Sequence, residues 1–293
     1  MYHYEYCPVC KSTDFTEVLR AKDHTVSKEE FSIAHCAQCG HRFTHPVPDQ
    51  DHIGPYYQSE EYISHSNTSK GFINWAYQVV RKRTLKSKRN LVGRFAGSSQ
   101  GQLLDIGAGT GAFLAEMKSS GWTAQGIEPD EGARQVARET WGLELAPASE
   151  FYGLPEGEFD VVTMWHVLEH VHELDRYLEK IYALLKPGGK WIVAVPNYTS
   201  WDADKYQAGW AAYDVPRHLY HFSPASMQAL VERGGFKLKG MKRMPFDSFY
   251  VSMLSERYKN GSMVAGVWNG FCSYVAALRQ KTRCSSLIYL IEK

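Results

Sequence analysis

A glycine-rich segment between an apolar run and a helical pattern is the part of this sequence most clearly arranged for chemistry. Residues 103–106, Leu-Leu-Asp-Ile, lead into residues 107–111, Gly-Ala-Gly-Thr-Gly, and a helix-forming run begins directly afterwards. Glycines let the backbone turn tightly and let a ligand approach the helix N-terminus. Glu128 ends the next apolar run, about 20 residues on, where a ribose diol would need an acceptor. The pattern predicts a site for a nucleoside-containing cofactor.

Two further motifs follow in order along the chain. Residues 159–171 form an apolar run that ends in Trp165-His166 and Glu169-His170, and residues 185–197 contain a Lys-Pro-Gly-Gly turn followed by a second apolar run. Because the loop reads D-x-G-x-G-x-G, and not the G-x-G-x-x-G of dinucleotide enzymes, the sequence resembles the class I S-adenosylmethionine (SAM) dependent methyltransferases over residues 103–197. The resemblance implies an α/β fold, a doubly wound, Rossmann-like, seven-stranded sheet.

The elements that must position these motifs can be read from the alternation of apolar runs. Strands are expected at 102–106, 123–128, 143–146, 159–165 and 190–195, with helices at 111–119, 130–141 and 173–185 between them. Such alternation favours parallel pairing with helices on both faces. A helix at 223–233, opened by Ser-Pro, and a closing strand at 286–293 follow. We divide the chain into a zinc ribbon (1–48), a helical linker or lid (49–98) and a methyltransferase domain (99–293) with a helical insertion at 246–285, which would cover the acceptor pocket or form a dimer face.

The resemblance also implies cofactor contacts. The methionine part of SAM would contact the glycine loop, and its sulfonium would lie near the end of the fourth strand. The ribose hydroxyls would donate to Glu128, and the adenine would lie against Pro129. Because the family often has an acid after the third strand and this chain has none there, Ser149 or a backbone carbonyl is the expected substitute. The cofactor residues are Asp105, Gly107, Ala108, Gly109, Gly111, Glu128, Pro129, Ser149, Trp165 and His166.

Two histidine clusters are candidates for the acceptor side of the reaction. Methyl transfer is an in-line displacement, so a base is needed only if the acceptor holds its proton at neutral pH. We expect His218, assisted by His166 or His221, to activate or position an acceptor hydroxyl, because histidine changes charge near neutrality. Glu169 and His170 are expected to stabilise a turn. The alternative is a divalent metal held by these residues together with His166 and His218, similar to an E-x-x-E-H motif of small-RNA methyltransferases.

Four of the six cysteines form two C-x-x-C pairs, Cys7/Cys10 and Cys36/Cys39. Each pair can point two thiolates at one tetrahedral ion, and four thiolates leave no open coordination position. The spacing therefore predicts a structural zinc in a small ribbon, whose strands lie near 15–19 and 31–35. A redox reading would need a thioredoxin-like context that is absent. Cys272 and Cys284 are expected to be packing residues.

Charge and composition limit the partners. The chain has 293 residues, 44% of them apolar, and Lys plus Arg (33) nearly balance Asp plus Glu (32). A near-neutral total gives no global argument for nucleic acid. Locally, residues 63–104 contain no acidic residue, while Lys70, Arg81 and further basic residues accumulate on one expected helix. A solvated helix face is expected, with a phosphate-bearing substrate or an anionic membrane as the alternatives.

The sequence predicts a cytoplasmic enzyme that methylates a small-molecule, sugar or lipid-linked acceptor. The sequence contains no signal peptide pattern and no run of about 20 apolar residues. Tyr56, Tyr57 and Tyr62 would form a lid over the cofactor or pack the ribbon to the core. A nucleic-acid methyltransferase or binding protein that uses the ribbon and the basic helix stays open as an alternative, as does a noncatalytic scaffold. The identity of the acceptor and the oligomeric state are left open.

Overall fold

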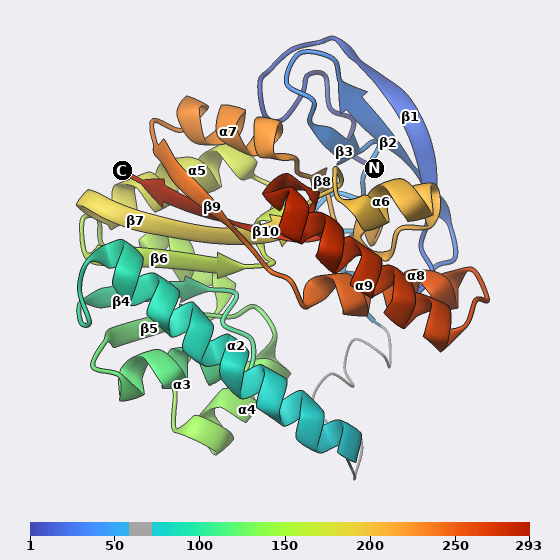
Figure 1. Ribbon diagram of the computed structural model, residues 1–293. Helices are drawn as coiled ribbons and strands as arrows, with labels where there is room; N and C mark the ends of the chain where they lie inside the picture. The colour runs from blue at the N-terminus through green and yellow to red at the C-terminus, as the bar shows by residue number, and fades with distance from the viewer. Residues whose placement is uncertain (59–71) are drawn as a thin grey trace.

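A six-stranded mixed sheet forms the centre of the molecule (Figure 1). The computed structural model describes residues 1–58 and 72–293. The strand order is β5-β4-β6-β7-β10-β9; the first four strands are parallel, and β10 runs antiparallel to both β7 and β9. The strands are β4 (Gln102–Ile106), β5 (Thr123–Ile127), β6 (Phe159–Trp165), β7 (Leu185–Pro196), β9 (Lys237–Arg243) and β10 (Ser286–Glu292). The fold is the doubly wound α/β class that the motifs predict.

The seventh strand of that prediction is absent as a strand in the described residues. The segment expected at 143–146 contributes only an isolated bridge between Ala146 and Ile127, at the outer edge of β5. Its apolar residues still pack: Leu143 and Leu145 are buried. Pro147 follows directly and begins the 3₁₀ turn η3 (Ala148–Gly153), so the extended segment ends after one bridge.

Helices cover both faces of the sheet, and the sheet residues alternate between them. On one face lie α2 (Phe72–Ala96), α3 (Ala112–Ser119) and α4 (Glu131–Trp141), packed against residues such as Val161 and Ile192. On the other lie α5 (Leu174–Leu184) and α7 (Pro224–Arg233), packed against Val162, Met164 and Val193. Successive residues of a strand point to opposite faces, which explains the continuous apolar runs of the buried strands.

The expected helix starts are present in the structure. Asp130 caps α4 by accepting a hydrogen bond from the Ala133 amide at 2.7 Å. Ser223 and Ser226 form a capping box at α7, with Pro224 in the first turn, as the Ser-Pro pair predicts.

The amino-terminal ribbon is built into the rest of the chain. Its strands β1 (Phe15–Lys22), β2 (Glu30–Cys36) and β3 (Arg42–Thr44) pair antiparallel, and β3 continues onto β8 (Tyr220–His221). Phe43 belongs to the same apolar cluster as Tyr220, Phe222 and Trp191. The ribbon therefore completes its sheet with residues from the loop in which sequence analysis places the acceptor histidines.

The expected helical insertion near the carboxyl end is a helical hairpin between β9 and β10. It consists of α8 (Asp247–Tyr258) and α9 (Met263–Arg279), and α6 (Trp201–Tyr206) lies against both helices. Figure 1 shows the ribbon and this hairpin on the same side of the sheet. Within the described residues, no helix has both the length and the apolar character that crossing a bilayer requires. Tyr62 and Lys70 lie outside the described residues.

A buried carboxylate joins these helices. Asp202 of α6 accepts hydrogen bonds from Trp210 Nε1, Ser273 Oγ and Ser285 Oγ, each at 2.7 Å, and is fully buried. One side chain thereby connects α6, α9 and the start of β10.

We expect Asp202→Ala to lower the free energy of unfolding by on the order of 3 kcal/mol, because three buried donors lose their acceptor. Asp204→Ala on the same helix is the matched control. Its exposed ion pair with Arg283 should contribute less than about 1 kcal/mol. Urea unfolding monitored by circular dichroism measures both, and equal losses would contradict the assigned role of Asp202.

Candidate active site

The glycine loop joins β4 to α3 and has the backbone that a ligand site needs. Gly107, Gly109 and Gly111 all have positive φ, at 73°, 53° and 76°. A Cβ on Gly107 would meet Val167 Cγ2 at 2.3 Å, whereas a Cβ on Gly109 would meet no atom within 4 Å. Gly107 is thus fixed by packing beneath the loop. Gly109 leaves an open face, and that is where a ligand can approach the backbone.

Glu128 stands directly after β5 and supports this loop. Its Oε2 accepts from the Gly109 amide at 2.7 Å, and its Oε1 accepts from the Asp130 amide at 3.0 Å. Burial is the main cause of the raised pKa of this carboxyl. The structure brings the loop and the acid together, as the site prediction requires, while Pro129 and Ser149 lie exposed on the segments that follow β5 and its bridge to Ala146.

Asp105 lies deeper than expected for a direct cofactor contact. Its side chain is 1% exposed, and its Oδ1 accepts from the Thr163 hydroxyl at 2.6 Å. Burial raises its pKa to about 7, against the opposing effect of Thr163. Its hydrogen-bond partner is therefore on the neighbouring strand β6, beneath the loop that it precedes.

Lys88 is a site residue that sequence analysis missed. It belongs to α2, within the basic run interpreted as a solvated face, yet its Nζ lies 4.1 Å from the ring centroid of Trp165. Burial lowers the pKa of this ammonium group, while the charges of Asp105 and Asp247 oppose that shift. Trp165 ends β6 and also packs edge-on against Phe113. A cation over an aromatic ring therefore forms one wall at the carboxyl end of β6.

His166, the residue after Trp165, lies between two carboxylates. Its φ of 61° is unusual for a residue with a side chain. Its Nε2 is 3.1 Å from Asp247 Oδ2, and its Nδ1 is 3.4 Å from Glu169 Oε1. Burial disfavours the charged ring, but the two carboxylates outweigh burial and raise its pKa to about 10. A ring that stays protonated at neutral pH cannot accept a proton, so we assign His166 a positioning role. Asp247 starts the insertion, and no local motif could have indicated it.

A second cluster contains Glu169, His170 and His218. One ligand-capable atom from each lies within 4.8 Å of the others. His170 Nδ1 is 3.0 Å from the Arg217 carbonyl, and His218 Nδ1 is 2.9 Å from the Ala212 carbonyl. Because a carbonyl only accepts, each Nδ1 carries a proton, and Nε2 is the ring nitrogen that remains for a ligand or a proton. Burial lowers the pKa of His170 to about 4, so this ring is neutral.

The carboxylate of this cluster lacks hydrogen-bond partners among the described residues. Glu169 is fully buried, and neither of its oxygens has a hydrogen-bond donor, since the contact with His166 lacks hydrogen-bond geometry. Burial alone would raise its pKa, but the neighbouring His166 charge lowers it overall. Glu169 therefore has an ion-pair contact with His166 but no hydrogen-bond donor among the described residues. Together with the two histidine rings it forms a site for a proton-bearing or cationic group.

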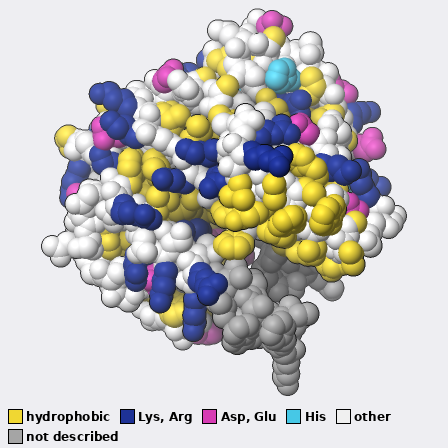
Figure 2. Space-filling view, in the orientation of Figure 1, with side chains coloured by type: hydrophobic (Ala, Val, Ile, Leu, Met, Phe, Trp, Pro, Cys, Tyr) yellow, Lys and Arg dark blue, Asp and Glu magenta, His cyan; other side chains and the backbone are white. Residues whose placement is uncertain are grey.

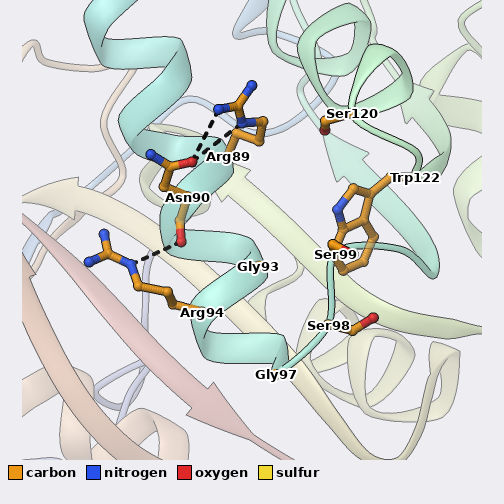
Figure 3. Close-up of a pocket in the computed structure, with 9 residues that line it drawn as sticks. All are labelled: Arg89, Asn90, Gly93, Arg94, Gly97, Ser98, Ser99, Ser120 and Trp122. Atoms are coloured by element: carbon orange, nitrogen blue, oxygen red, sulfur yellow. Dashed lines mark hydrogen bonds between the residues drawn. The ribbon is translucent and has the colours of Figure 1, made fainter.

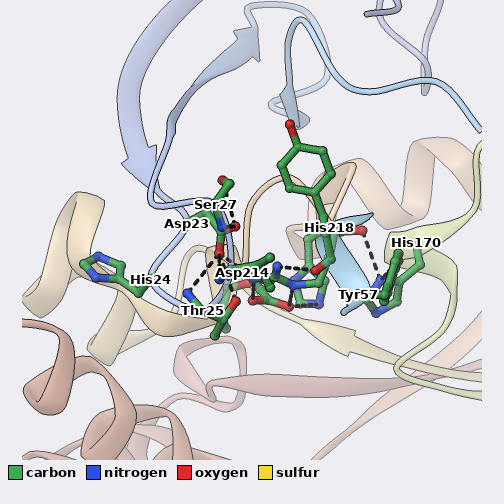
Figure 4. Close-up of polar contacts among 12 residues, drawn as sticks. Asp23, His24, Thr25, Ser27, Tyr57, His170, Asp214 and His218 are labelled. Atoms are coloured by element: carbon green, nitrogen blue, oxygen red, sulfur yellow. Dashed lines mark hydrogen bonds and ion pairs between the residues drawn. The ribbon is translucent and has the colours of Figure 1, made fainter. Parts of the chain in front are cut away.

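The same cluster is held from the ribbon side (Figure 4). Tyr57 OH is 3.1 Å from His170 Nδ1. Arg217 donates to Asp214 and to Asp23 of the ribbon, through NH2 at 2.6 and 3.1 Å, and its NH1 donates to the Tyr56 carbonyl at 2.8 Å. Tyr56 and Tyr57 therefore contact the acceptor-side loop and His170, and the expected lid over the cofactor stays a prediction.

His221 lies at a different place from the one expected. Its Nε2 is 3.2 Å from Thr44 Oγ1 of the ribbon, and its ring packs edge-on against Tyr213. Burial lowers its pKa well below the usual value. The structure gives His221 partners in the β3–β8 contact, so we leave it out of the acceptor cluster.

The four ribbon cysteines converge. Cys7 and Cys39 sulfurs are 3.6 Å apart, Cys10 and Cys36 sulfurs are 3.5 Å apart, and all four lie within 4.8 Å. Four thiolates around zinc, at the usual Zn–S length, would be about 3.8 Å apart. The two cysteine turns also have the same backbone geometry. The Lys11 amide donates to the Cys7 carbonyl, and the Gly40 amide donates to the Cys36 carbonyl, each at 2.9 Å. Lys11 and Gly40 both have positive φ.

A surface hollow lies elsewhere on the molecule (Figure 3). It is lined by the end of α2, including Arg89 and Arg94, and by Ser98, Ser99 and Trp122. These residues precede β4 and β5, so the hollow lies at the amino ends of those strands, opposite the glycine loop. Ligands of open α/β sheets bind at the carboxyl ends, and we do not assign this hollow to the active site.

A glycine loop that is open to solvent beside a buried acid, at the carboxyl edge of a doubly wound sheet, is the arrangement of a SAM-dependent methyltransferase, and this chain is an enzyme of that class. It belongs to the methyltransferase domain family, whose model matches residues 77–239.

Individual relatives agree with this assignment. The chain is 31% identical over 168 residues to a ubiquinone biosynthesis O-methyltransferase of Bordetella avium, covering 52% of this chain and 69% of that protein. It is 32% identical to the protein of the same name from Thiobacillus denitrificans, covering 58% and 78%. The fold is similar to that of a Burkholderia thailandensis 1,6-didemethyltoxoflavin-N1-methyltransferase, crystallised with S-adenosylhomocysteine, at a TM-score of 0.53, with 16% identity and coverage of 93% and 99%.

We expect Gly109→Ala to weaken SAM binding by at least about tenfold, because the added methyl enters the open face of the loop. Gly142→Ala is the control: Gly142 also has a positive φ and open space around it, but it ends α4. Both variants should lose about 1–2 kcal/mol of stability from backbone strain. Calorimetric titration with SAM compares them, and similar affinities in the two variants would exclude the loop as the cofactor site.

Proposed function

We propose that this enzyme transfers a methyl group from SAM to a hydroxyl of a small-molecule, sugar or lipid-linked acceptor. The observation that carries the proposal is the cluster of Glu169, His170 and His218, in which two histidine rings and a carboxylate without a hydrogen-bond donor lie beside His166 at the end of β6. Two relatives named O-methyltransferase add support.

The cofactor would be held by the glycine loop, Glu128 and the Trp165 wall. When bound, SAM supplies an activated methyl group on a positively charged sulfur. The open backbone at Gly109 fits a ligand that approaches closely, and the Glu128 carboxylate is the acid that the ribose hydroxyls require. We include Pro129, Ser149 and Ala108 in the proposed cofactor site, because they lie at the same edge of the sheet. Asp105 would support the glycine loop from below.

His218 is the residue we propose as the base. Its Nδ1–H is fixed on the Ala212 carbonyl, so its Nε2 can take the hydroxyl proton. The nearby carboxylates of Glu169 and Asp214, the latter with its Oδ2 at 4.0 Å, would stabilise the imidazolium that forms. His166 keeps Glu169 in place and links it to Asp247.

The same three residues would also serve as ligands for a divalent cation, and one observation supports this second mechanism. Ligating histidines usually donate their other N–H to a carbonyl or carboxylate, as His170 and His218 do here. Two histidines and one carboxylate are an established combination for zinc and iron. In this second mechanism Glu169, His170 and His218 would hold the cation, which would supply Lewis acidity toward the acceptor hydroxyl.

We expect His218→Ala to keep its SAM affinity while methyl transfer falls about a hundredfold or more, as for a lost general base. His172→Ala is the control, because His172 also bonds a carbonyl, that of Pro48, but lies outside the cluster. The assay follows methyl label into a hydroxyl acceptor. Unimpaired transfer by His218→Ala would show that the enzyme works by alignment alone.

Treatment with a chelator distinguishes the two mechanisms. Activity that is lost and then restored by a divalent salt, with the cysteine site still loaded, would assign the cluster to a cation. Activity that survives chelation would leave His218 as the base.

We also propose a structural zinc at Cys7, Cys10, Cys36 and Cys39, which fixes the ribbon that carries Asp23. Cys36→Ser should lose one zinc per chain and loosen the amino terminus while the sheet stays folded, since a four-thiolate site holds a fold with little core of its own. Cys272→Ser is the control outside the cluster. Elemental analysis with limited proteolysis tests this, and full zinc content in the Cys36 variant would point to another site.

A further inference from the structure

Helix α9 turns its small residues toward the protein and its large apolar residues toward solvent, the reverse of an ordinary surface helix. Its buried positions hold small residues: Gly266, Gly270, Ser273 and Ala277. Its exposed positions hold large apolar ones, with Val264 79%, Trp268 64%, Leu278 53% and Phe271 48% exposed. A surface helix normally turns its large apolar residues inward. The exposed residues follow one another at helical spacing, so they form a continuous apolar stripe along α9.

The reversed orientation is fixed by close packing against α8. A Cβ on Gly266 would come within 2.6 Å of Met253 Cα, and a Cβ on Gly270 within 2.7 Å of Phe249 Cα. Asn269 donates to Tyr206 OH and to Glu256, and Ser273 donates to Asp202. Because only the small face fits against α8, α9 cannot rotate to bury its stripe.

Basic residues predominate on and beside the helices that carry the stripe. Helix α9 contains no acidic residue, and the two acids of α8 point inward: Asp247 contacts His166, and Glu256 binds Tyr206 and Asn269. Arg279 ends α9 and Lys281 follows it; both are exposed, and neither has an ion-pair partner within the described part of the chain. Figure 2 shows the apolar area with basic side chains around it and few acidic ones.

We propose that the α9 stripe, defined as Val264, Val267, Trp268, Phe271 and Leu278, is a binding surface for an anionic lipid bilayer. The helix would lie in the plane of the interface, with the stripe, about 20 Å long, among the headgroups and upper chains. Exposed cations at its edge add attraction to anionic lipid. A second copy of the chain fits less well, because a two-fold contact would bring two basic rims together.

The position of the hairpin connects this surface to the reaction site. Asp247, the first residue of α8, contacts His166 at the end of β6. If the proposed function holds, a lipid-linked acceptor held in the bilayer would reach the acceptor cluster along this hairpin. Vesicle binding itself needs no acceptor, so its failure is distinguishable from failure of methyl transfer.

The experiment is vesicle sedimentation with the full chain. Wild type should bind vesicles of phosphatidylcholine with phosphatidylglycerol, bind pure phosphatidylcholine much less, and lose affinity as salt rises. Trp268→Ser with Phe271→Ser should reduce binding at least about tenfold, because two apolar side chains no longer leave water. Trp141→Ser is the control, since Trp141 is 45% exposed on α4, away from the stripe.

Two further measurements decide the outcome. The double variant should keep its circular dichroism spectrum, its SAM affinity and its activity on a water-soluble acceptor. Arg279→Glu with Lys281→Glu should abolish the preference for anionic vesicles. Equal binding by wild type and the double variant would overturn the proposal. So would a wild type that binds no vesicles and becomes monomeric only when the stripe is altered, because a second copy would then cover this face.

Discussion

A single buried guanidinium, that of Arg217, joins the parts of this enzyme that lie far apart in sequence. It pairs with Asp214 in its own loop and with Asp23 of the ribbon, whose side chain is 0% exposed. The two carboxylates compensate the positive charge of Arg217. Burial alone would raise the pKa of Asp23, but its backbone hydrogen bonds and Arg217 lower that pKa well below the usual range. The carbonyl of Arg217 fixes His170. A buried charge without its partners is strongly unfavourable, so ribbon, loop and acceptor cluster depend on one another.

This dependence makes the ribbon part of the structure that holds the cluster of Glu169, His170 and His218. The ribbon contributes Asp23 to Arg217 and Thr44 to His221, and the segment just after it contributes Tyr57 to His170. The proposed SAM side is organised by local sequence, from β4 to α4. The proposed acceptor side is assembled from the ribbon, the loop after β7 and the start of the insertion. An enzyme of this design can keep one cofactor site and change its acceptor by changing the added parts.

What could be predicted from sequence follows the same division. The strands, helix caps, glycine loop and Glu128 are set by local pattern and were found, because periodicity and turn residues act over a few positions. The prediction of a third strand at 143–146 was wrong, because Pro147 ends the extended segment after one bridge. Lys88, Asp247 and the Arg217 network were missed because their partners lie tens to hundreds of residues away. His166 was expected to assist His218; because Asp247 and Glu169 raise its pKa, we assign it a positioning role.

The pairing of β3 with β8 also bears on how the chain reaches its native state. Arg42 and Phe43 find their partners at His221 and Tyr220, so the outer edge of β3 has no neighbour until the loop after β7 has been made and docked. Contacts of such long sequence separation form slowly. During synthesis an open strand edge is a template for pairing with other chains. A metal clamp at Cys36 and Cys39, in the turn that joins β2 to β3, would keep the register of that edge fixed while the rest of the protein emerges.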